Sequence, residues 1–108
     1  LTTLPKHQAT FLPTEASLAR IKAGGDHIAT TISWGGNNRS CAIRLPDTGS
    51  HYKHIEHRVS GADADIGAVI NAVIAGMQYG IEHRITPPQP IYGNANLPIY
   101  GLPKLIAE

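Results

Sequence analysis

The chain has 108 residues, of which 42% are hydrophobic and 16% are charged, and its formal net charge is +1. This is enough apolar material for one small globular domain, and more than a disordered chain contains. The near-zero net charge gives no support for a nucleic-acid-binding or membrane-binding surface. Seven of the nine lysines and arginines lie at or before Arg58, a distribution that favours a small acidic ligand.

The cysteine count and the ends of the chain restrict the protein further. Cys41 is the only cysteine, which excludes an intramolecular disulfide and a zinc site built from several cysteines. A lone thiol fits a reducing cytoplasm. No apolar run reaches the roughly 18 residues that a membrane span needs, and no signal sequence is visible. Because the chain begins at Leu1 without a methionine, we expect it to be a piece of a longer polypeptide.

The first third of the chain is predicted to contain short elements separated by loops. The expected elements are the end of a helix over residues 1–11, a helical turn over 14–21, a loop over 22–27 and a strand over 28–34. Pro5 and Pro13 confine the first helix. The strand is rich in isoleucine and threonine and stops at a Gly-Gly pair.

The middle of the chain predicts an antiparallel hairpin. Its strands are residues 39–45 and 52–59, and the connection contains Pro46 and a glycine turn. Side chains alternate between the two faces of a strand. His54, Glu56 and Arg58 are therefore expected on one face of the second strand, and Ile55, His57 and Val59 on the other.

The clearest prediction is a helix over residues 64–83. Its apolar residues recur at spacings of three and four, which indicates one buried stripe; they are Ile66, Val69, Ile70, Val73, Ile74, Met77 and Ile81. Asp63 or Asp65 is a candidate N-cap, and Gly80 a candidate end. Five prolines after Ile85 exclude regular structure from the tail, which must lie against another part of the fold. Together these elements predict an α+β fold.

The hairpin also carries the residues best suited to chemistry. Arg39, Arg44 and Arg58 offer planar donor forks that match phosphate and carboxylate oxygens, and Glu56 offers hard oxygen ligands for Mg²⁺ or Mn²⁺. One interpretation is a site where phosphate, metal and a carboxylic acid meet. The other is a solvated hairpin whose exposed ion pairs contribute little. Spacing alone favours the second interpretation.

The histidines and the single tryptophan could likewise have either a ligand-binding role or a structural role. His51, His54 and His57 are three residues apart, so on a strand they alternate between faces and form no common chelate. His54 and Glu56 share a face and are a possible pair of metal ligands. We expect Trp34 to be a packing residue, with stacking on a ligand as the alternative.

Four segments together resemble the glutamine synthetase family. Asn38-Arg39-Ser40-Cys41-Ala42-Ile43-Arg44-Leu45-Pro46 is similar to the family signature Asn-Arg-Ser-Ala-x-Ile-Arg-Ile-Pro. Ile55-Glu56-His57-Arg58 resembles the family's Val-Glu-x-Arg strand, and Gly61-Ala62-Asp63-Ala64 leads into a long helix as in the family. Upstream, Ser17-Leu18-Ala19-Arg20-Ile21 resembles Ser-Tyr-Lys-Arg-Leu. The order of the segments also agrees.

This resemblance implies a ligase that phosphorylates the γ-carboxylate of glutamate with ATP, after which ammonia or another amine displaces phosphate. Carried over residue by residue, Arg39 is the catalytic residue and contacts both the phosphates and glutamate, whereas Arg44 binds the ATP phosphates. Arg58 and Arg20 bind glutamate. Glu56 binds the Mg²⁺ or Mn²⁺ that bridges the phosphates.

The same resemblance implies the organisation of the whole protein. Residues 1–108 would be part of the catalytic domain, with antiparallel active-site strands packed with a long helix. The β-grasp domain would precede them and further helices would follow. The expected partners are ATP, glutamate and an amine, in a cytoplasmic homo-oligomeric ring without nucleic acid or membrane. Alone, the fragment is expected to be inactive.

The positions at which this sequence differs from the family pattern bear on which amine is the acceptor. Ammonia-specific enzymes carry a glutamate in the loop after the Arg20-like residue, and the nearest carboxylate here is Asp26, which is one methylene shorter. The Trp34-Gly35-x-x-Asn38-Arg39 segment is similar to the branch that joins glutamate to polyamines or other amines. A non-catalytic, structural or regulatory member of the family is the rival interpretation, although retention of all four hairpin residues argues against it.

Overall fold

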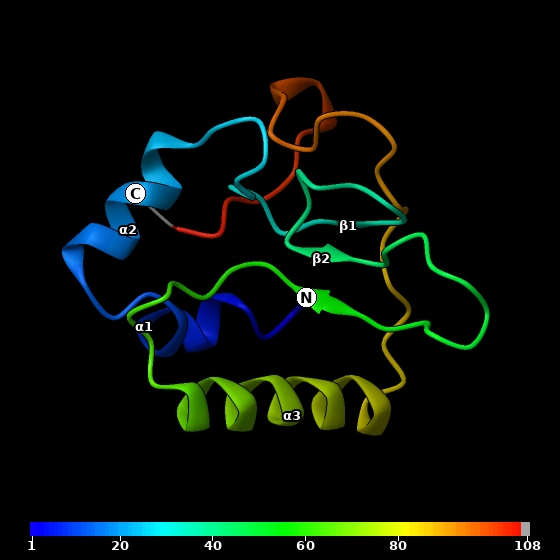
Figure 1. The fold of residues 1–108 in the computed structure, drawn as a ribbon, viewed down its shortest axis with the longest axis horizontal. Coiled ribbons are helices and arrows are strands. Elements are labelled where there is room, and N and C mark those ends of the chain that lie inside the picture. Colours follow the sequence, from blue (N-terminus) through cyan, green and yellow to red (C-terminus); the bar gives the residue numbers. More distant parts are fainter. Residues whose placement is uncertain (107–108) are drawn as a thin grey trace.

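A computed structural model describes residues 1–106 as two short α-helices, one long α-helix and a small sheet joined by long loops (Figure 1). In chain order the elements are η1 (Pro5–His7), α1 (Gln8–Phe11), α2 (Glu15–Ala23), β1 (Trp34–Gly35), β2 (Ile43–Arg44), β3 (Glu56–His57), α3 (Ile66–Glu82) and η2 (Pro98–Tyr100). The three α-helices and the three-stranded sheet are compatible with the α+β class. None of the helices in residues 1–106 is long and apolar enough to span a membrane.

The sheet has the order β1-β2-β3 and contains both kinds of pairing. Strands β2 and β3 are antiparallel, with Ile43 opposite His57 and Arg44 opposite Glu56, so the predicted hairpin is confirmed. Its paired region is much shorter than predicted, because each strand has only two residues. Strand β1 runs parallel to β2, so the expectation of antiparallel strands alone is wrong.

The strand predicted over 28–34 is wrong for most of its length. Only Trp34 belongs to a strand, β1, whereas residues 30–32 bind the tail of the chain instead. The amide of Ile32 donates to Pro103, that of Leu105 donates to Thr30, and Thr31 and Lys104 form an isolated antiparallel bridge. A single bridge is not a strand. The β-branched residues of this segment therefore lie in irregular backbone that is hydrogen-bonded to the tail.

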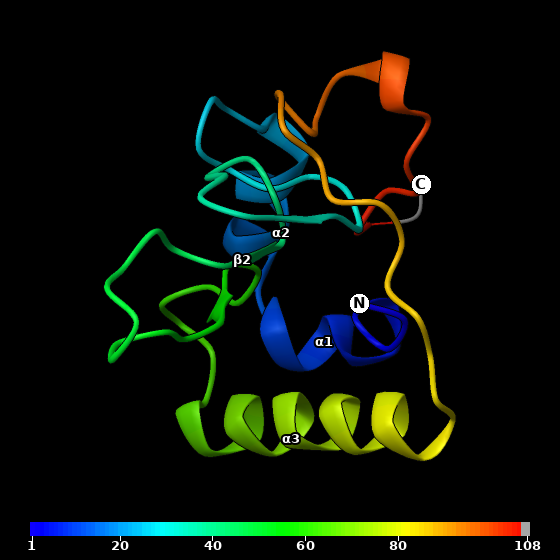
Figure 2. The same cartoon turned by 90° about the vertical axis from the view of Figure 1, so that its right-hand side faces the viewer.

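The tail crosses from the end of α3 to the far side of the sheet, as Figures 1 and 2 show. Near β1, the amide of Ile91 donates to the carbonyl of Trp34 at 2.9 Å. A Cβ atom on Gly35 would lie 2.6 Å from the Ile91 carbonyl oxygen, so only glycine permits this close approach. The predicted irregular tail is confirmed, apart from the short helix η2.

Helix α3 confirms the predicted helix but not its predicted burial. It begins after Asp65, whose Oδ2 accepts from the Ala68 amide at 3.0 Å, and it continues past Gly80 to Glu82. Ala72 is buried, and Val69 and Val73 pack partly against the core. The other stripe residues are 48–78% exposed, namely Ile66, Ile70, Ile74, Met77 and Ile81. Their predicted burial, including that of Met77, is wrong, because α3 meets α1 and the first residues along one face only.

Helix α2 positions the loop that approaches the sheet. It begins with a capping box in which Thr14 Oγ1 accepts from the Ser17 amide and Ser17 Oγ accepts from the Thr14 amide, each at 3.1 Å. Ile21 from this helix joins Phe11, Leu12 and Val59 in the main core. A smaller cluster of Cys41, Ile91 and Ala95 holds the tail against the segment between β1 and β2.

Candidate functional site

Glu56 lies between two arginines on one face of the sheet. Arg44 Nη1 donates to Glu56 Oε2 and Arg58 Nε donates to Glu56 Oε1, each at 2.8 Å. Pairing of β2 with β3 places Arg44 opposite Glu56, and alternation along the chain brings Arg58 to the same side. The side chains of Arg44 and Arg58 are only 12% and 15% exposed, whereas that of Glu56 is 36% exposed. The predicted common face of Glu56 and Arg58 is therefore confirmed, and the cluster is not a solvated pair.

Arg58 also ties β3 to two loops. Its Nη1 donates to the carbonyl of Arg39 and, at 3.5 Å, to that of Cys41. Its Nη2 donates to the carbonyl of His27 at 3.1 Å. All three guanidinium nitrogens are engaged, and one Nη2 hydrogen is left for a further acceptor.

Arg44 has a donor without a partner. Its Nη2 donates to Asn37 Oδ1, but its Nε is buried and has no hydrogen-bond partner within residues 1–106. Two guanidinium groups and one carboxylate leave this cluster with a surplus of one positive charge. This surplus positive charge, on side chains that are only partly exposed, would be stabilised by an anionic ligand at the accessible edge of the cluster.

Arg39 lies apart from the ion-paired cluster. Its side chain is exposed and lines an open cavity of about 430 Å³, together with Asp26, His27 and Tyr92. Arg20 is also exposed, and its Nη2 donates to the carbonyl of Val59 at 3.1 Å. It therefore braces the residue that follows Arg58.

Asn38 and Ser40 form a network for which sequence reasoning had no role. Asn38 Oδ1 accepts from the amide and the hydroxyl of Ser40, at 3.0 and 2.7 Å. Asn38 Nδ2 donates to the carbonyls of Ile91 and Gly93, at 2.7 and 2.8 Å. The two polar residues that flank Arg39 in the family signature thus join its loop to the tail. Their place in that signature was the only sequence signal for them.

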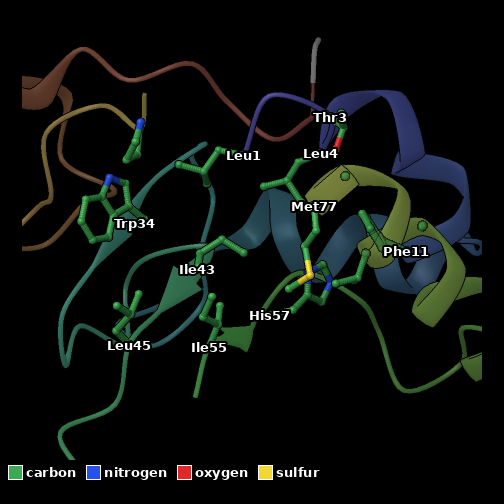
Figure 3. A pocket seen from close by; sticks show the side chains of 14 residues that line it. Leu1, Thr3, Leu4, Phe11, Trp34, Ile43, Leu45, Ile55, His57 and Met77 are labelled. Carbon is green, nitrogen blue, oxygen red and sulfur yellow. The ribbon is translucent and has the colours of Figure 1, made fainter. Parts of the chain in front are cut away.

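The other face of the sheet borders an apolar pocket of about 310 Å³ beneath α3 (Figure 3). His57 lies in it, and its ring centroid is 4.5 Å from that of Phe11. Burial lowers the pKa of His57, and its Nε2 accepts from the amide of Ser60 at 3.2 Å. Trp34 lines the same pocket and donates from Nε1 to the carbonyl of Pro88 at 2.6 Å. His57 therefore has an aromatic packing partner, and Trp34 has a hydrogen-bond acceptor in the tail.

Residues 1–106 hold no group of three or more histidine, cysteine, aspartate and glutamate side chains suited to a metal ion. His54 is exposed, with its Nδ1 2.9 Å from the carbonyl oxygen of Tyr52. Cys41 is fully buried, and burial raises the pKa of its thiol. Glu56 therefore stands as a single carboxylate among basic groups.

Comparison with known proteins identifies the family. The model for "Glutamine synthetase, catalytic domain" matches residues 1–98. The chain is 35% identical over 100 residues to gamma-glutamylputrescine synthetase PuuA of Escherichia coli, covering 93% of this chain and 21% of that protein. It is 36% identical over 87 residues to glutamate–isopropylamine ligase of a Pseudomonas species, covering 81% and 19%. It is 34% identical over 71 residues to gamma-glutamylethanolamide synthetase GlnA4 of Streptomyces coelicolor, covering 66% and 15%.

These relatives belong to the amine-ligase branch that the residues between Trp34 and Arg39 resemble. The chain spans about a fifth of their length. Because the family model covers most of the chain, and a relative more than 30% identical covers nearly all of it, this chain belongs to the glutamine synthetase family and lies within its catalytic domain.

Proposed function

We propose that residues 1–108 contribute to the active site of an ATP-dependent ligase that joins the γ-carboxylate of glutamate to an amine. The observation that supports this most directly is the Arg44–Glu56–Arg58 cluster, in which two guanidinium groups and one carboxylate leave a surplus positive charge. The names of the relatives point the same way, since they describe synthesis of gamma-glutamylputrescine, ligation of glutamate with isopropylamine and synthesis of gamma-glutamylethanolamide.

The chemistry explains why basic side chains are needed. A carboxylate resists attack until one of its oxygens becomes part of a leaving group. ATP transfers its terminal phosphoryl group to the γ-carboxylate, which gives γ-glutamyl phosphate and ADP. The amine nitrogen then attacks the acyl carbon, the bond to phosphate breaks and the nitrogen loses a proton. Positive side chains stabilise the charge on the transferring phosphoryl group.

Each arginine has a proposed role. Arg39 is exposed on an open cavity and would contact the phosphates and glutamate. Arg44 would bind the ATP phosphates. Arg58 would hold a glutamate carboxylate with its remaining Nη2 hydrogen, while its other donors keep the loops at His27 and Arg39 in place. Arg20, fixed to the backbone beside Arg58, would also contact glutamate.

Glu56 fits a divalent metal as one ligand of a larger set. Each of its oxygens accepts one hydrogen bond from arginine, so each keeps a lone pair, and the side chain is about a third exposed. A carboxylate together with phosphate oxygens is the usual coordination of Mg²⁺, and Mn²⁺ accepts similar oxygen ligands. When bound, the metal would neutralise phosphate charge. Its other protein ligands would come from outside residues 1–106, because these contain no group of three or more side chains suited to a metal ion.

The test uses a preparation in which these residues are joined to the rest of the family's catalytic and β-grasp domains. We expect ADP and phosphate to form in step with a γ-glutamyl amide, measured by coupled assay and mass spectrometry with glutamate, ATP, Mg²⁺ and a panel of amines. Phosphate release without an amide would contradict the reaction. Absence of both would favour a structural or regulatory protein. The homo-oligomeric ring and the cytoplasmic location belong to the same proposal, and sedimentation analysis tests the former.

A further inference from the structure

Tyr92 stands on a segment of the tail that is fixed on both sides. Asn38 Nδ2 donates to the carbonyls immediately before and after it, those of Ile91 at 2.7 Å and Gly93 at 2.8 Å. The amide of Ala95 donates to Ser40 Oγ at 2.8 Å. Ile91 and Ala95 are 9% and 0% exposed. The backbone that carries Tyr92 is therefore held by buried neighbours and by polar contacts with the Arg39 loop.

The Tyr92 side chain itself is 90% exposed. Within residues 1–106 some aromatic side chains have ring partners, such as Tyr79, which stacks on His83 with ring centroids 4.0 Å apart, whereas Tyr52 is 75% exposed. Tyr92 makes no such ring contact in the same part of the chain. A large aromatic side chain left in water on an anchored backbone contributes nothing to the core, and exposed aromatic groups of this kind are typical of binding surfaces.

Tyr92 lines the cavity that also contains Arg39 and Asp26. The lining of this cavity includes a basic side chain, an acidic side chain and an aromatic ring. An alkylammonium compound matches the second and third features: its charged end is attracted to a carboxylate and to an aromatic face, and its carbon chain to the ring. Ammonia has no carbon chain to contact the ring.

From this juxtaposition we propose that Tyr92 is a specificity-determining residue, which contacts the carbon chain of a primary alkylamine acceptor and so favours it over ammonia. The inference rests on the proposed ligase function. It concerns only the choice of acceptor and leaves the phosphoryl-transfer residues unchanged. The attachment of the segment supports it, because the hydrogen bonds on both sides of Tyr92 fix the backbone position from which its side chain reaches the cavity.

The experiment compares Tyr92→Ala and Tyr92→Phe with the wild-type ligase, using ammonia and the n-alkylamines from methylamine to butylamine. In the wild type, kcat/KM is expected to rise with chain length. Tyr92→Ala should lower kcat/KM for butylamine about tenfold, equivalent to about 1.4 kcal/mol, and leave the value for ammonia unchanged. Tyr92→Phe should retain the preference. Ile99→Ala, at an 85% exposed position of the same tail, is the matched control and should behave as wild type.

An equal loss for ammonia and butylamine, or no loss for either, would overturn the inference. Equilibrium binding of butylamine, measured by calorimetry without turnover, separates this result from failure of the ligase proposal. If butylamine binds about tenfold more weakly to Tyr92→Ala but no amide forms with any enzyme, the ligase reaction is wrong and Tyr92 is still an amine contact. If amide forms and butylamine binds equally well to the wild type and to Tyr92→Ala, the proposed ligase function is supported and the proposed role of Tyr92 is wrong.

Discussion

Asn38 Nδ2 lies 2.7 Å from the carbonyl oxygen of Ile91, a residue 53 positions later in the chain. A second bond from the same amide reaches Gly93 at 2.8 Å. The loop that presents Arg39 and the tail that presents Tyr92 are thereby joined through one side chain. Because both bonds involve backbone carbonyls, their geometry depends on the tail's course and not on its side chains.

Loss of this amide should destabilise the fold. Asn38→Ala removes two donors and leaves the carbonyls of Ile91 and Gly93 without them, at an expected cost of about 2 kcal/mol in the free energy of unfolding. Urea unfolding measures the change. Asn71→Ala, at an exposed position of α3, is the control and should change stability by no more than about 0.5 kcal/mol. Equal stability of the two variants would show that the tail is held by its apolar contacts alone.

Helix α3 allows a comparison between a packed and an exposed position. Val73 packs partly against the core, whereas Ile81 is 78% exposed. Val73→Asp should lower the free energy of unfolding by about 2 kcal/mol or more, because it places a charge against apolar side chains. Ile81→Asp should cost about 0.5 kcal/mol or less. Similar losses at both positions, measured by thermal unfolding of the same preparation, would mean that the exposed face is covered in solution.

The sequence correctly predicted those features of the fold that depend on residues close together in the chain. The spacing of apolar residues predicted α3, and of the two N-cap candidates, Asp63 and Asp65, the second caps it. Alternation along the second hairpin strand placed Glu56 and Arg58 on one face, as their 2.8 Å contact requires. These features depend on residues that are near in the chain or paired across one turn.

What sequence reasoning missed depends on partners that are distant in the chain. Burial of Ile66 and Met77 was predicted from periodicity, but periodicity does not say how much of a helix surface meets other elements. Residues 30–32 have the composition of a strand, yet their partner is the tail near Pro103. The bonds from Asn38 to the tail likewise link segments that no local pattern connects.

The half-buried His57 predicts a dependence of stability on pH. Because burial lowers the pKa of His57, the unfolded chain binds more protons than the folded chain when the pH falls below about 6.5. The stability associated with neutral His57 is complete above that pH and is lost as the pH falls through the lowered folded pKa. His57→Phe keeps a ring next to Phe11 and should lack this part of the pH dependence. Parallel slopes for both proteins in urea unfolding between about pH 7.5 and about pH 5 would contradict the assignment.

The chain by itself should not turn over ATP. Only one candidate carboxylate ligand, Glu56, lies in the basic cluster, and residues 1–106 hold no group of three or more side chains suited to a metal ion. Incubation with ATP, Mg²⁺, glutamate and an amine should give no phosphate above background. Phosphate release that increases in proportion to the purified 108-residue chain would show that the site is more complete than its ligands indicate.

Glu56 and Arg58 form one ion pair, yet substitution of each should impair a different binding step in the complete ligase. Glu56→Gln keeps the size of the side chain but removes the charge that a hard cation requires. Metal should bind at least about tenfold more weakly, and added Mg²⁺ or Mn²⁺ should restore part of the activity. The same change leaves Arg44 and Arg58 without their counter-ion, so stability should also fall by about 2 kcal/mol.

Arg58→Lys keeps the positive charge but replaces three donor nitrogens by one. A single ammonium group cannot serve Glu56 and the carbonyls of Arg39 and His27 together. The KM for glutamate should therefore rise at least about tenfold, and added metal should not restore it. Both variants are titrated with metal at fixed glutamate and then with glutamate at fixed metal, at a temperature where circular dichroism shows each to be folded. Rescue of Arg58→Lys by metal, or wild-type behaviour of Glu56→Gln at low metal, would make this cluster a structural tie and not a ligand site.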